Sequence, residues 1–309
     1  MQNEPPLVSI VIVSYNVKSL LSDCIISLQK YISVPFEIIV VDNASADGTQ
    51  ESIKKDFPTV KLIENKSNIG FSAANNLGFN LAKAETIFIL NPDTELKDNS
   101  FTILLDFIKN ENDFIAGPEL LNTDGTHQIS YWHYPKVLQH VLELFFLTKF
   151  IDISKYKTIN NKINTEVDFC SGAALLMKKT TLQKLNGLDE HLFWMDDVDL
   201  CYRNKLNGGK TFYVPGCNIT HHLGASGKKN YNIVISNQII SKLKYYDKHK
   251  QYFNFCISLP VFLLQIATRI PIFLILSPVK KEFFKKFIAY CYTFVKLIKY
   301  LFMNEESVV

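Results

Sequence analysis

Acidic side chains stand at the ends of two apolar runs in the first third of the chain. Asp93 follows residues 86–90 through Asn91 and Pro92, and Asp42 directly follows the apolar end of the segment 37–41. Short apolar runs that stop at turn residues predict buried strands, and open α/β sheets bind ligands beyond the carboxyl ends of such strands. The same residue types also favour turns and helix caps, so neither position alone distinguishes a ligand site from a turn.

A third acidic group consists of Asp196, Asp197 and Asp199, at the predicted start of a helix. These closely spaced carboxylates repel one another, so either the helix dipole or a function must compensate. Capping of the helix is the alternative, but a single Asp would suffice for it. We therefore treat the group as a candidate for proton-transfer chemistry.

Two histidines, His221 and His222, end a predicted strand at residues 218–221. Neighbouring side chains in a strand point to opposite faces, so only one of the two can face a site at this edge. We select His221 as the candidate, although a single histidine is more often structural than a ligand.

The elements that must position these residues alternate between strand and helix patterns. Strands are predicted at residues 8–14, 37–41, 60–63 and 86–90, with helical segments such as 17–31 between them. This alternation predicts an α/β fold with a mostly parallel sheet and right-handed crossovers.

The second half of the predicted domain adds one helix and more strands. A buried strand is predicted at residues 167–177, where Gly172 lets a backbone approach a ligand, and two further strands at 211–214 and 218–221. The helix that starts at the acidic group is predicted to end at Gly208-Gly209.

Composition and motifs exclude several classes of protein. The 309 residues suffice for one large α/β domain with an appendage, and a net charge of +3 argues against nucleic acid as a partner. No glycine-rich fingerprint follows the first strand and no P-loop motif occurs, which argues against nicotinamide enzymes and P-loop NTPases. The six cysteines are scattered without a C-x-x-C pair, as expected for buried thiols of a cytosolic protein. The start of the chain carries an acid and prolines, so we expect no signal peptide.

The C-terminal part differs in character from the rest. Residues 230–250 predict a basic helix, and residues 253–279 contain one charge, Arg269, over a length that could span a bilayer. Pro260 and Pro271 interrupt this stretch and lysines flank both ends, so we expect a membrane-embedded hairpin or interfacial helices rather than a crossing.

The last predicted helix has one basic and one apolar side. Lys281, Lys285, Lys296 and Lys299 share one stripe, and large apolar side chains lie opposite. This pattern is typical of a helix on an anionic membrane surface, with packing on the catalytic domain as the alternative.

Four motifs resemble, in order and spacing, the family 2 glycosyltransferases with the GT-A fold, and most of all their rhamnosyltransferase-type members. They are Val-Ser-Ile-Val-Ile-Val-Ser-Tyr-Asn, Val-Val-Asp-Asn-Ala-Ser, Asn-Ile-Gly-Phe-Ser-Ala-Ala-Asn-Asn and Leu-Asn-Pro-Asp-Thr. The resemblance covers about residues 7–226. It implies a GT-A domain at residues 1–228. The patterns of the C-terminal part predict a helical, membrane-associated region at residues 229–309.

The resemblance implies a nucleotide-sugar donor site at the sheet edge. Asp42 would contact the base, and Asn91-Pro92-Asp93 stands where the family has Asp-x-Asp, with Asn91 as a departure. Asp93 would then be the main carboxylate on a Mg²⁺ or Mn²⁺ ion, with His221 of a His-x-x-Gly-x-Ser signature assisting the metal or the diphosphate. The other residues expected around the donor are Ser14, Tyr15, Asn16, Asn68, Gly70, Asn75, Asn91 and Gly172.

The acidic group resembles the family's Glu-Asp-x-Asp motif. The resemblance implies that Asp197 is the general base that takes the proton of the acceptor hydroxyl, in a single displacement that inverts the anomeric carbon. Asp196 and Asp199 would hold the acceptor or support the helix. Trp194 offers a face for sugar stacking, unless it is a plain core aromatic.

Three further segments remain open in their roles. Residues 122–135 line the sugar site or form an ordinary polar loop, and residues 137–151 cover the acceptor site or touch the bilayer. Residues 155–165 predict a mobile polar connection.

The expected protein is an inverting, metal-dependent glycosyltransferase at the cytoplasmic face of the cell membrane, acting in cell-surface polysaccharide assembly. Its donor is a nucleoside-diphosphate sugar and its acceptor a hydroxyl of a glycan or polyprenyl-linked molecule. A processive polysaccharide synthase is an alternative, but neither Trp132 nor Trp194 follows the arginine of a Gln-x-x-Arg-Trp motif. A non-catalytic sugar-nucleotide scaffold is another, against which the joint presence of Asp93, Asp197 and His221 argues.

Overall fold

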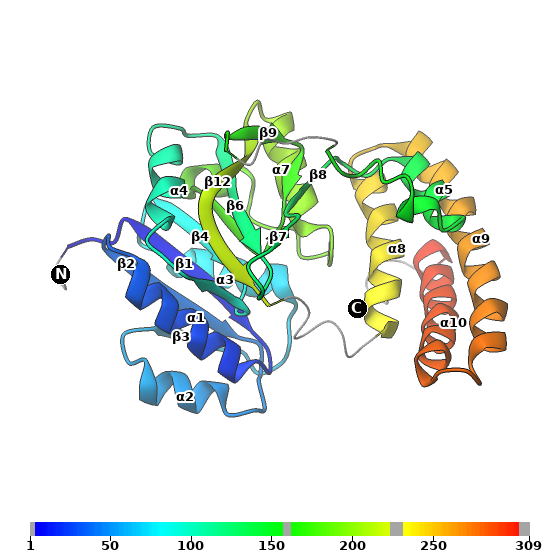
Figure 1. Cartoon of the computed structure of the whole chain (residues 1–309), viewed down its shortest axis with the longest axis horizontal. Coiled ribbons are helices and arrows are strands. Elements are labelled where there is room, and N and C mark those ends of the chain that lie inside the picture. Colours follow the sequence, from blue (N-terminus) through cyan, green and yellow to red (C-terminus); the bar gives the residue numbers. More distant parts are fainter. Residues whose placement is uncertain (1–3, 157–161, 223–230, 303–309) are drawn as a thin grey trace. The chain divides into compact units, whose positions relative to one another are not determined.

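The computed structural model describes residues 4–156, 162–222 and 231–302, and the chain forms two compact units (Figure 1). The first consists of Met1–His133, Tyr156–His191 and Asp196–Ser226, and the second of Tyr134–Lys155, Leu192–Met195 and Gly227–Val309. The second unit thus takes in two short segments that we had assigned to the first domain. Of the predicted connection at 155–165, residues 157–161 lie outside the described residues.

A mixed sheet forms the centre of the first unit. Its parallel half has the order β3 (Lys61–Glu64), β2 (Phe36–Asp42), β1 (Val8–Ser14) and β4 (Thr86–Leu90). The order continues with β11 (Ala174–Lys178), β6 (Phe114–Leu121), β12 (Lys210–His221) and β5 (Thr94–Leu96), where β11 is antiparallel to both of its neighbours. All side chains of β1 and β4 are buried, as expected for strands that are covered on both faces.

Helices cover both faces of this sheet. One apolar core joins the sheet to α1 (Lys18–Tyr31), α2 (Thr49–Asp56) and α4 (Phe101–Ile108). A second core joins the opposite face to α3 (Phe71–Leu81), α6 (Lys179–Lys184) and α7 (Asp196–Leu206). The carboxyl ends of β1, β2 and β4 therefore meet at one edge, between two layers of helices.

Two predicted strand patterns differ in the structure. Residues 167–177 do not form one strand, because β9 (Thr165–Val167) pairs with β12 and β10 (Phe169–Cys170) pairs with β8 (Tyr131–Trp132) in a separate small sheet. Conversely, residues 211–214 and 218–221 belong to the single strand β12, whose register on β6 shifts between Val214 and Asn218. Pro215 and Gly216 thus produce an irregularity within one strand, in place of the predicted division into two strands.

The second unit is helical. It contains α5 (Val137–Leu144), the short 3-10 helix η1 (Leu147–Lys149), α8 (Tyr231–Lys248), α9 (Tyr252–Leu276) and α10 (Lys281–Phe302). The predicted hairpin at 253–279 is wrong, since α9 runs through Pro260 and Pro271 as one helix. Each proline removes one backbone hydrogen bond, but packing of Phe262 and Ile266 against α8 and α10 stabilises the helix.

Candidate active site

Asp93 and His221 lie beside each other at the carboxyl edge of the sheet. The strand β5, which follows Asp93, pairs with the end of β12, and the backbone N–H of His222 donates to the Asp93 carbonyl over 2.8 Å. Asp93 Oδ1 and His221 Nε2 are 3.4 Å apart, and the two residues are 7% and 9% exposed. His222 instead contacts Glu95, with its Nε2 at 2.7 Å from Glu95 Oε1.

The Asp93–His221 pair suits a divalent cation. Two ligands at right angles on an ion, with bonds of about 2.1 Å, lie about 3 Å apart, which is close to the observed separation. The described residues contain no group of three or more His, Cys, Asp or Glu side chains that could hold a metal. The donor diphosphate and water would therefore have to supply the remaining ligands of such an ion.

Asp197 is held by the backbone that leads into β11. The Gly172 N–H donates to Asp197 Oδ2 over 2.9 Å, and the Ala173 carbonyl accepts from the Asn91 N–H over 2.8 Å. A Cβ on Gly172 would lie 3.3 Å from the Asp197 Cβ, so glycine permits this close approach. Residues 171–173 thus connect the carboxylate of Asp197 with the corner that carries Asp93.

The environment favours the protonated forms of Asp196 and Asp197. Burial raises the pKa of Asp197, against hydrogen bonds from the N–H groups of Gly172 and Val198 that lower it. Burial and the negative charge of Asp197 raise the pKa of Asp196. The carboxylate of Asp197 is consequently a stronger base than an ordinary aspartate, which suits removal of a proton from a hydroxyl group.

Asp199 is engaged inside the fold, and its predicted contact with the acceptor stays a prediction. It is fully buried, and its Oδ2 accepts from Arg203 Nε over 2.7 Å, one helical turn away. The Arg203 guanidinium also donates to the carbonyls of Leu185 and Gly187. Of the two roles considered for Asp199, support of α7 agrees with this position.

Asp42 is fully buried at the end of β2 and engaged by its own loop. Its carboxylate accepts hydrogen bonds from the N–H and Oγ of Ser45, over 2.9 and 2.5 Å, and from Gln50 Nε2 over 2.7 Å. This is the turn and cap pattern that we considered as an alternative. A carboxylate offers about four acceptor positions, so contact with a base stays a prediction.

The loops after β1 and β2 are joined by Asn16. Its backbone N–H donates to Ser45 Oγ over 2.9 Å, and its Oδ1 accepts from the Ala46 N–H over 2.7 Å. Neighbouring Tyr15 is 45% exposed, whereas Ser14 is fully buried. The donor-binding roles of Ser14, Tyr15 and Asn16 stay predictions.

Asn68, Gly70 and Asn75, which are expected around the donor, lie at the start of α3. Asn68 Oδ1 accepts from the Gly70 N–H over 3.0 Å, and Gly70 has a φ of +90°, which favours glycine. Asn75 is fully buried, and its Nδ2 donates to the Phe71 carbonyl over 3.0 Å. These contacts give Asn68, Gly70 and Asn75 structural roles, and contact with a donor is not tested by them.

Trp194 is 46% exposed with a φ of +79° and belongs to the second unit, so it is not a core aromatic residue.

Within the segment 122–135, Gln128 lies against His221, with its Oε1 at 2.8 Å from His221 Nδ1. No local pattern predicts this contact, because the two residues are far apart in the chain. The Gly224 and Ser226 positions of the histidine signature lie outside the described residues.

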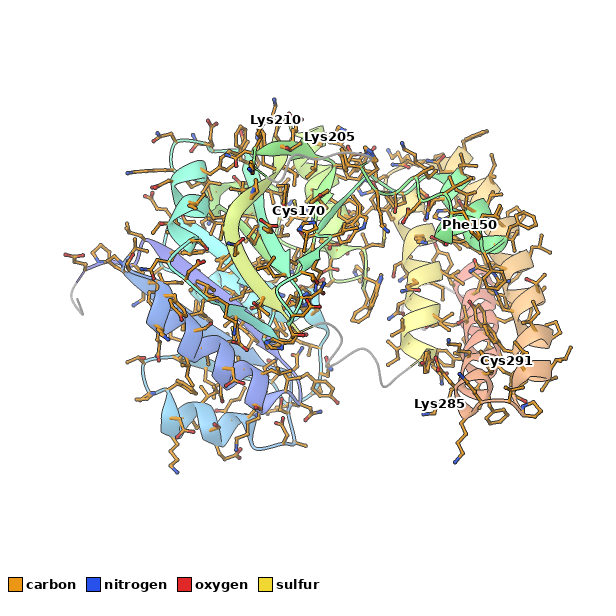
Figure 2. All side chains as sticks on the ribbon, in the orientation of Figure 1. Phe150, Cys170, Lys205, Lys210, Lys285 and Cys291 are labelled. Carbon is orange, nitrogen blue, oxygen red and sulfur yellow. The ribbon has the colours of Figure 1, made fainter. Side chains whose placement is uncertain are left out.

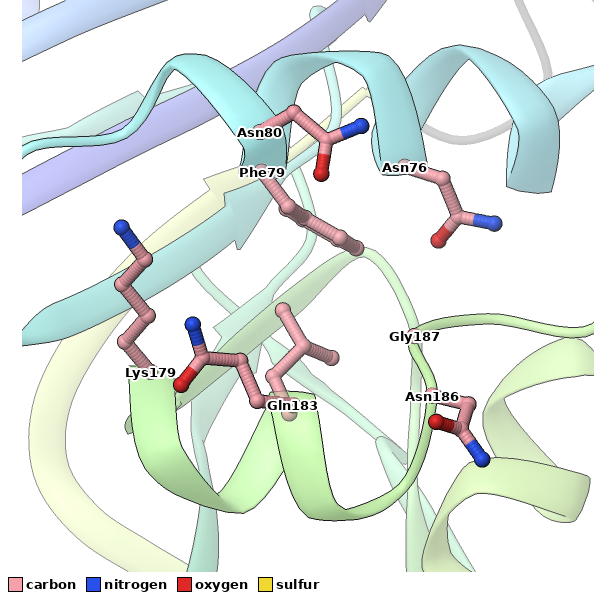
Figure 3. A pocket seen from close by; sticks show the side chains of 8 residues that line it. Asn76, Phe79, Asn80, Lys179, Gln183, Asn186 and Gly187 are labelled. Atoms are coloured by element: carbon pink, nitrogen blue, oxygen red, sulfur yellow. The ribbon is translucent and has the colours of Figure 1, made fainter.

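A pocket of about 380 Å³ lies away from these side chains, between α3 and α6 (Figure 3). Two of its polar side chains, Asn76 and Lys179, have hydrogen-bond partners within the chain. Asn76 exchanges hydrogen bonds with the backbone of Leu188, and Lys179 Nζ donates to the Ala82 carbonyl over 2.7 Å. The pocket is therefore a weaker candidate than the edge that carries Asp93, His221 and Asp197.

Comparison with known proteins identifies the family. The model of the family described as glycosyl transferase family 2 matches residues 9–185, more than half of the chain. The chain belongs to this glycosyltransferase family. Glycosyl transferase family 2 membership agrees with the GT-A fold of the first unit, which solved structures of glycosyltransferases share.

Relatives extend over most of the chain. An N-acetylglucosaminyl-diphospho-decaprenol L-rhamnosyltransferase of Mycobacterium tuberculosis is 26% identical over 231 residues, covering 69% of this chain and 75% of that protein. The rhamnosyltransferase WbbL of Escherichia coli is 26% identical over 165 residues, covering 50% and 61%. The mannosyltransferase PcManGT from Pyrobaculum calidifontis, solved with GDP-Man and Mn²⁺, has a TM-score of 0.57 at 14% identity and covers 98% of this chain and 89% of its own.

Proposed function

We propose that this glycosyltransferase moves a sugar from a nucleoside diphosphate to a hydroxyl group, with inversion at the anomeric carbon. The proposal rests above all on one observation, the link from Asp197 through Gly172 and Ala173 to the corner that carries Asp93. It brings a carboxylate of raised pKa to the same sheet edge as a candidate cation site. Base and leaving-group stabilisation are both required for such a transfer.

Asp197 is the proposed general base. It accepts the proton of the acceptor hydroxyl while the hydroxyl oxygen bonds to the anomeric carbon and the nucleoside diphosphate leaves from the opposite side. The Gly172 N–H donates to its Oδ2 and orients it, and burial raises the pKa of Asp197. One displacement without a covalent intermediate gives inversion.

Asp93 and His221 are the proposed metal ligands. A bound Mg²⁺ or Mn²⁺ would neutralise charge on the departing diphosphate. The 3.4 Å separation of Asp93 Oδ1 and His221 Nε2 supports this assignment, as does the Mn²⁺ in the PcManGT structure. The proposed donor side is completed by Asp42, Asn91 and the loops that Asn16 and Gly70 shape.

The proposed acceptor is a polyprenyl-linked glycan in cell-surface polysaccharide assembly, reached at the cytoplasmic face of the membrane. The decaprenol-linked substrate in the name of the mycobacterial relative supports the acceptor class. Association with a membrane is supported by α9, which is long and apolar enough to span a bilayer and has only 17% of its most apolar stretch buried. Its one charge, Arg269, is buried and donates to the carbonyls of Glu143 and Leu144.

We infer that the second unit lies on the membrane rather than crossing it. Its helices pack on one another, and α8 and α10 carry lysines that would enter the hydrocarbon if α9 crossed. Exposed apolar side chains also lie on α10 and at Phe150, which directly follows η1. Phe150 and Lys285 lie toward opposite ends of this unit (Figure 2). Seating in the interface would cover the apolar face and leave lysines near lipid phosphates.

The test is turnover on a panel of nucleotide sugars, namely dTDP-rhamnose, UDP-galactose, UDP-glucose and GDP-mannose. Nucleotide release is measured with Mg²⁺, Mn²⁺ or a chelator, with membrane lipid extract as the acceptor, for the wild type and Asp93→Asn. We expect release from one donor that needs metal and is lost in Asp93→Asn, but not in Asp106→Asn, an exposed matched control on α4. Donor binding without any turnover would instead favour a sugar-nucleotide scaffold.

A further inference from the structure

A chain of hydrogen bonds leads from the turn after β6 to His221. It runs from Asp124 through Thr126, Asn122 and Gln128 to the Nδ1 atom of His221. Asn122 and Thr126 close the turn, and the short strand β7 (His127–Gln128) carries Gln128, which is 9% exposed. All these residues belong to the first unit.

The turn fixes the direction of the first bonds in this chain. Thr126 Oγ1 donates to the carboxylate of Asp124 over 2.6 Å, because an ionised carboxylate can only accept. Thr126 Oγ1 therefore accepts from Asn122 Nδ2, at 2.9 Å. This leaves Asn122 Oδ1 to accept from Gln128 Nε2, at 3.0 Å.

The other end of the chain agrees with this direction. Gln128 Nε2 also lies 3.3 Å from the His221 carbonyl, which can only accept, so the amide nitrogen must face it. The Gln128 Oε1 atom then faces His221 Nδ1 at 2.8 Å and accepts its hydrogen. A neutral His221 with hydrogen on Nδ1 has only a lone pair on Nε2, and that lone pair faces Asp93 Oδ1 at 3.4 Å.

We propose that Gln128 is a positioning residue that fixes the Nδ1–H tautomer of His221 and so presents the Nε2 lone pair, together with Asp93, to a divalent cation. Two acceptor atoms that face each other without a hydrogen between them repel, and a cation between them removes that repulsion. Partners that hold the second nitrogen of a ligating histidine fix its ring and its tautomer in the same way. The inference rests on the proposed metal-dependent function for its consequence, but the tautomer itself is a property of the metal-free protein.

The first experiment measures the tautomer directly. The metal-free wild type, labelled with ¹⁵N at histidine, is examined by long-range ¹H–¹⁵N NMR at a pH of about 8, where an ordinary histidine is neutral. The His221 signals are assigned by their absence in His221→Asn. We expect hydrogen on Nδ1, and hydrogen on Nε2 would overturn the proposal whatever the activity of the protein.

The second experiment measures Mn²⁺ affinity by EPR, with Mn²⁺ alone and with UDP. Gln128→Leu keeps the approximate volume but accepts no hydrogen bond, and we expect it to weaken Mn²⁺ binding about 10- to 100-fold. Gln128→Glu retains an acceptor for Nδ1–H and should lose much less. Mn²⁺ binding by folded Gln128→Leu as tight as in the wild type would overturn the proposal.

Gln139→Leu is the matched control. Gln139 is also 9% exposed and accepts a backbone hydrogen bond, from the Ile153 N–H over 3.2 Å, but it belongs to the second unit. We expect unchanged Mn²⁺ affinity in this variant. A wild type that binds no Mn²⁺ but has the Nδ1–H tautomer would refute the metal assignment of the proposed function and leave the Gln128–His221 contact in place.

Discussion

At the scale of single residues, the chemistry depends on how Asp197 is held. Its carboxylate accepts a hydrogen bond from the Gly172 N–H and stands next to Asp196 in the first turn of α7. Burial destabilises the ionised form of Asp197, and hydrogen bonds from backbone N–H groups partly offset this effect. The pKa of Asp197 is raised as a result, so its carboxylate is a stronger base than that of an ordinary aspartate.

The raised pKa of Asp197 predicts the pH dependence of the reaction. Because Asp197 must be deprotonated to accept a proton, kcat/KM should fall as the pH decreases through its pKa, and this acid limb should lie above the ordinary aspartate value of about 3.9. The measurement is the pH profile of kcat/KM at saturating metal. An acid limb at or below the ordinary value would contradict the assignment.

The raised pKa of Asp196 predicts that its side chain lowers the free energy of unfolding at neutral pH. The folded protein binds a proton that the unfolded chain releases, so stability is full below the unfolded pKa and is lost as the pH rises through the raised value. Asp196→Asn should therefore raise the Tm at pH about 8 and change it little at pH about 4. Thermal unfolding at the two pH values checks this, and an equal shift at both would contradict it.

At the scale of elements, the connection from α6 to α7 is fixed by Gly187. Gly187 has a φ of +71°, and a Cβ there would lie 2.4 Å from Asn76 Oδ1. Both residues line the pocket in Figure 3. Asn76 in turn exchanges hydrogen bonds with Leu188. These contacts tie the loop that leads toward Asp197 to α3.

Gly187→Ala should therefore destabilise the protein by about 2–4 kcal/mol, from backbone strain plus the clash with Asn76. Gly125→Ala is the matched control, since its φ is +81° but no atom lies within 4 Å of the added Cβ. It should cost only the strain, about 1 kcal/mol. Urea unfolding measures both, and equal losses would show that the Asn76 contact is unimportant.

The elements also show which features a sequence can predict. The strands at 8–14 and 86–90 are confirmed to the residue, because long runs of buried β-branched and apolar residues end at turn signals. The strands β7, β8 and β10 have two residues each and follow from tertiary pairing, so no local period marks them.

The candidate site was predictable only where residues are close in sequence. The pairing of Asp199 with Arg203 is an i,i+4 contact that helix spacing makes visible. The contact of Gln128 with His221 joins strands whose register no local pattern specifies. Likewise, Gly172 reaches Asp197 only because β11 is antiparallel to β4, which the alternating pattern of the first half did not predict.

At the scale of the whole molecule, the two units have different surfaces. The first buries its apolar residues in two cores on either side of a sheet. The second exposes many, and the exposed positions of α9 carry no charge. Such an uncharged face is typical of contact with lipid.

Vesicle flotation tests this surface. The wild type should bind anionic vesicles more tightly than neutral ones, and added salt should weaken binding because lysines contribute. A double variant, Leu264→Asp with Ile275→Asp, should lose binding, whereas Leu206→Asp, at an exposed leucine of α7, should not. Undiminished binding by the double variant would contradict the location of the membrane face on α9.

The most direct test of the proposed chemistry separates donor binding from turnover in Asp197→Asn. Donor affinity is measured with Mn²⁺ by calorimetry, and nucleotide release is measured with the acceptor, beside Asp106→Asn as the control. We predict unchanged donor affinity and a kcat lower by about 10²- to 10⁴-fold, because the base acts only when the hydroxyl attacks. A kcat within a few-fold of the wild type would contradict the role of Asp197.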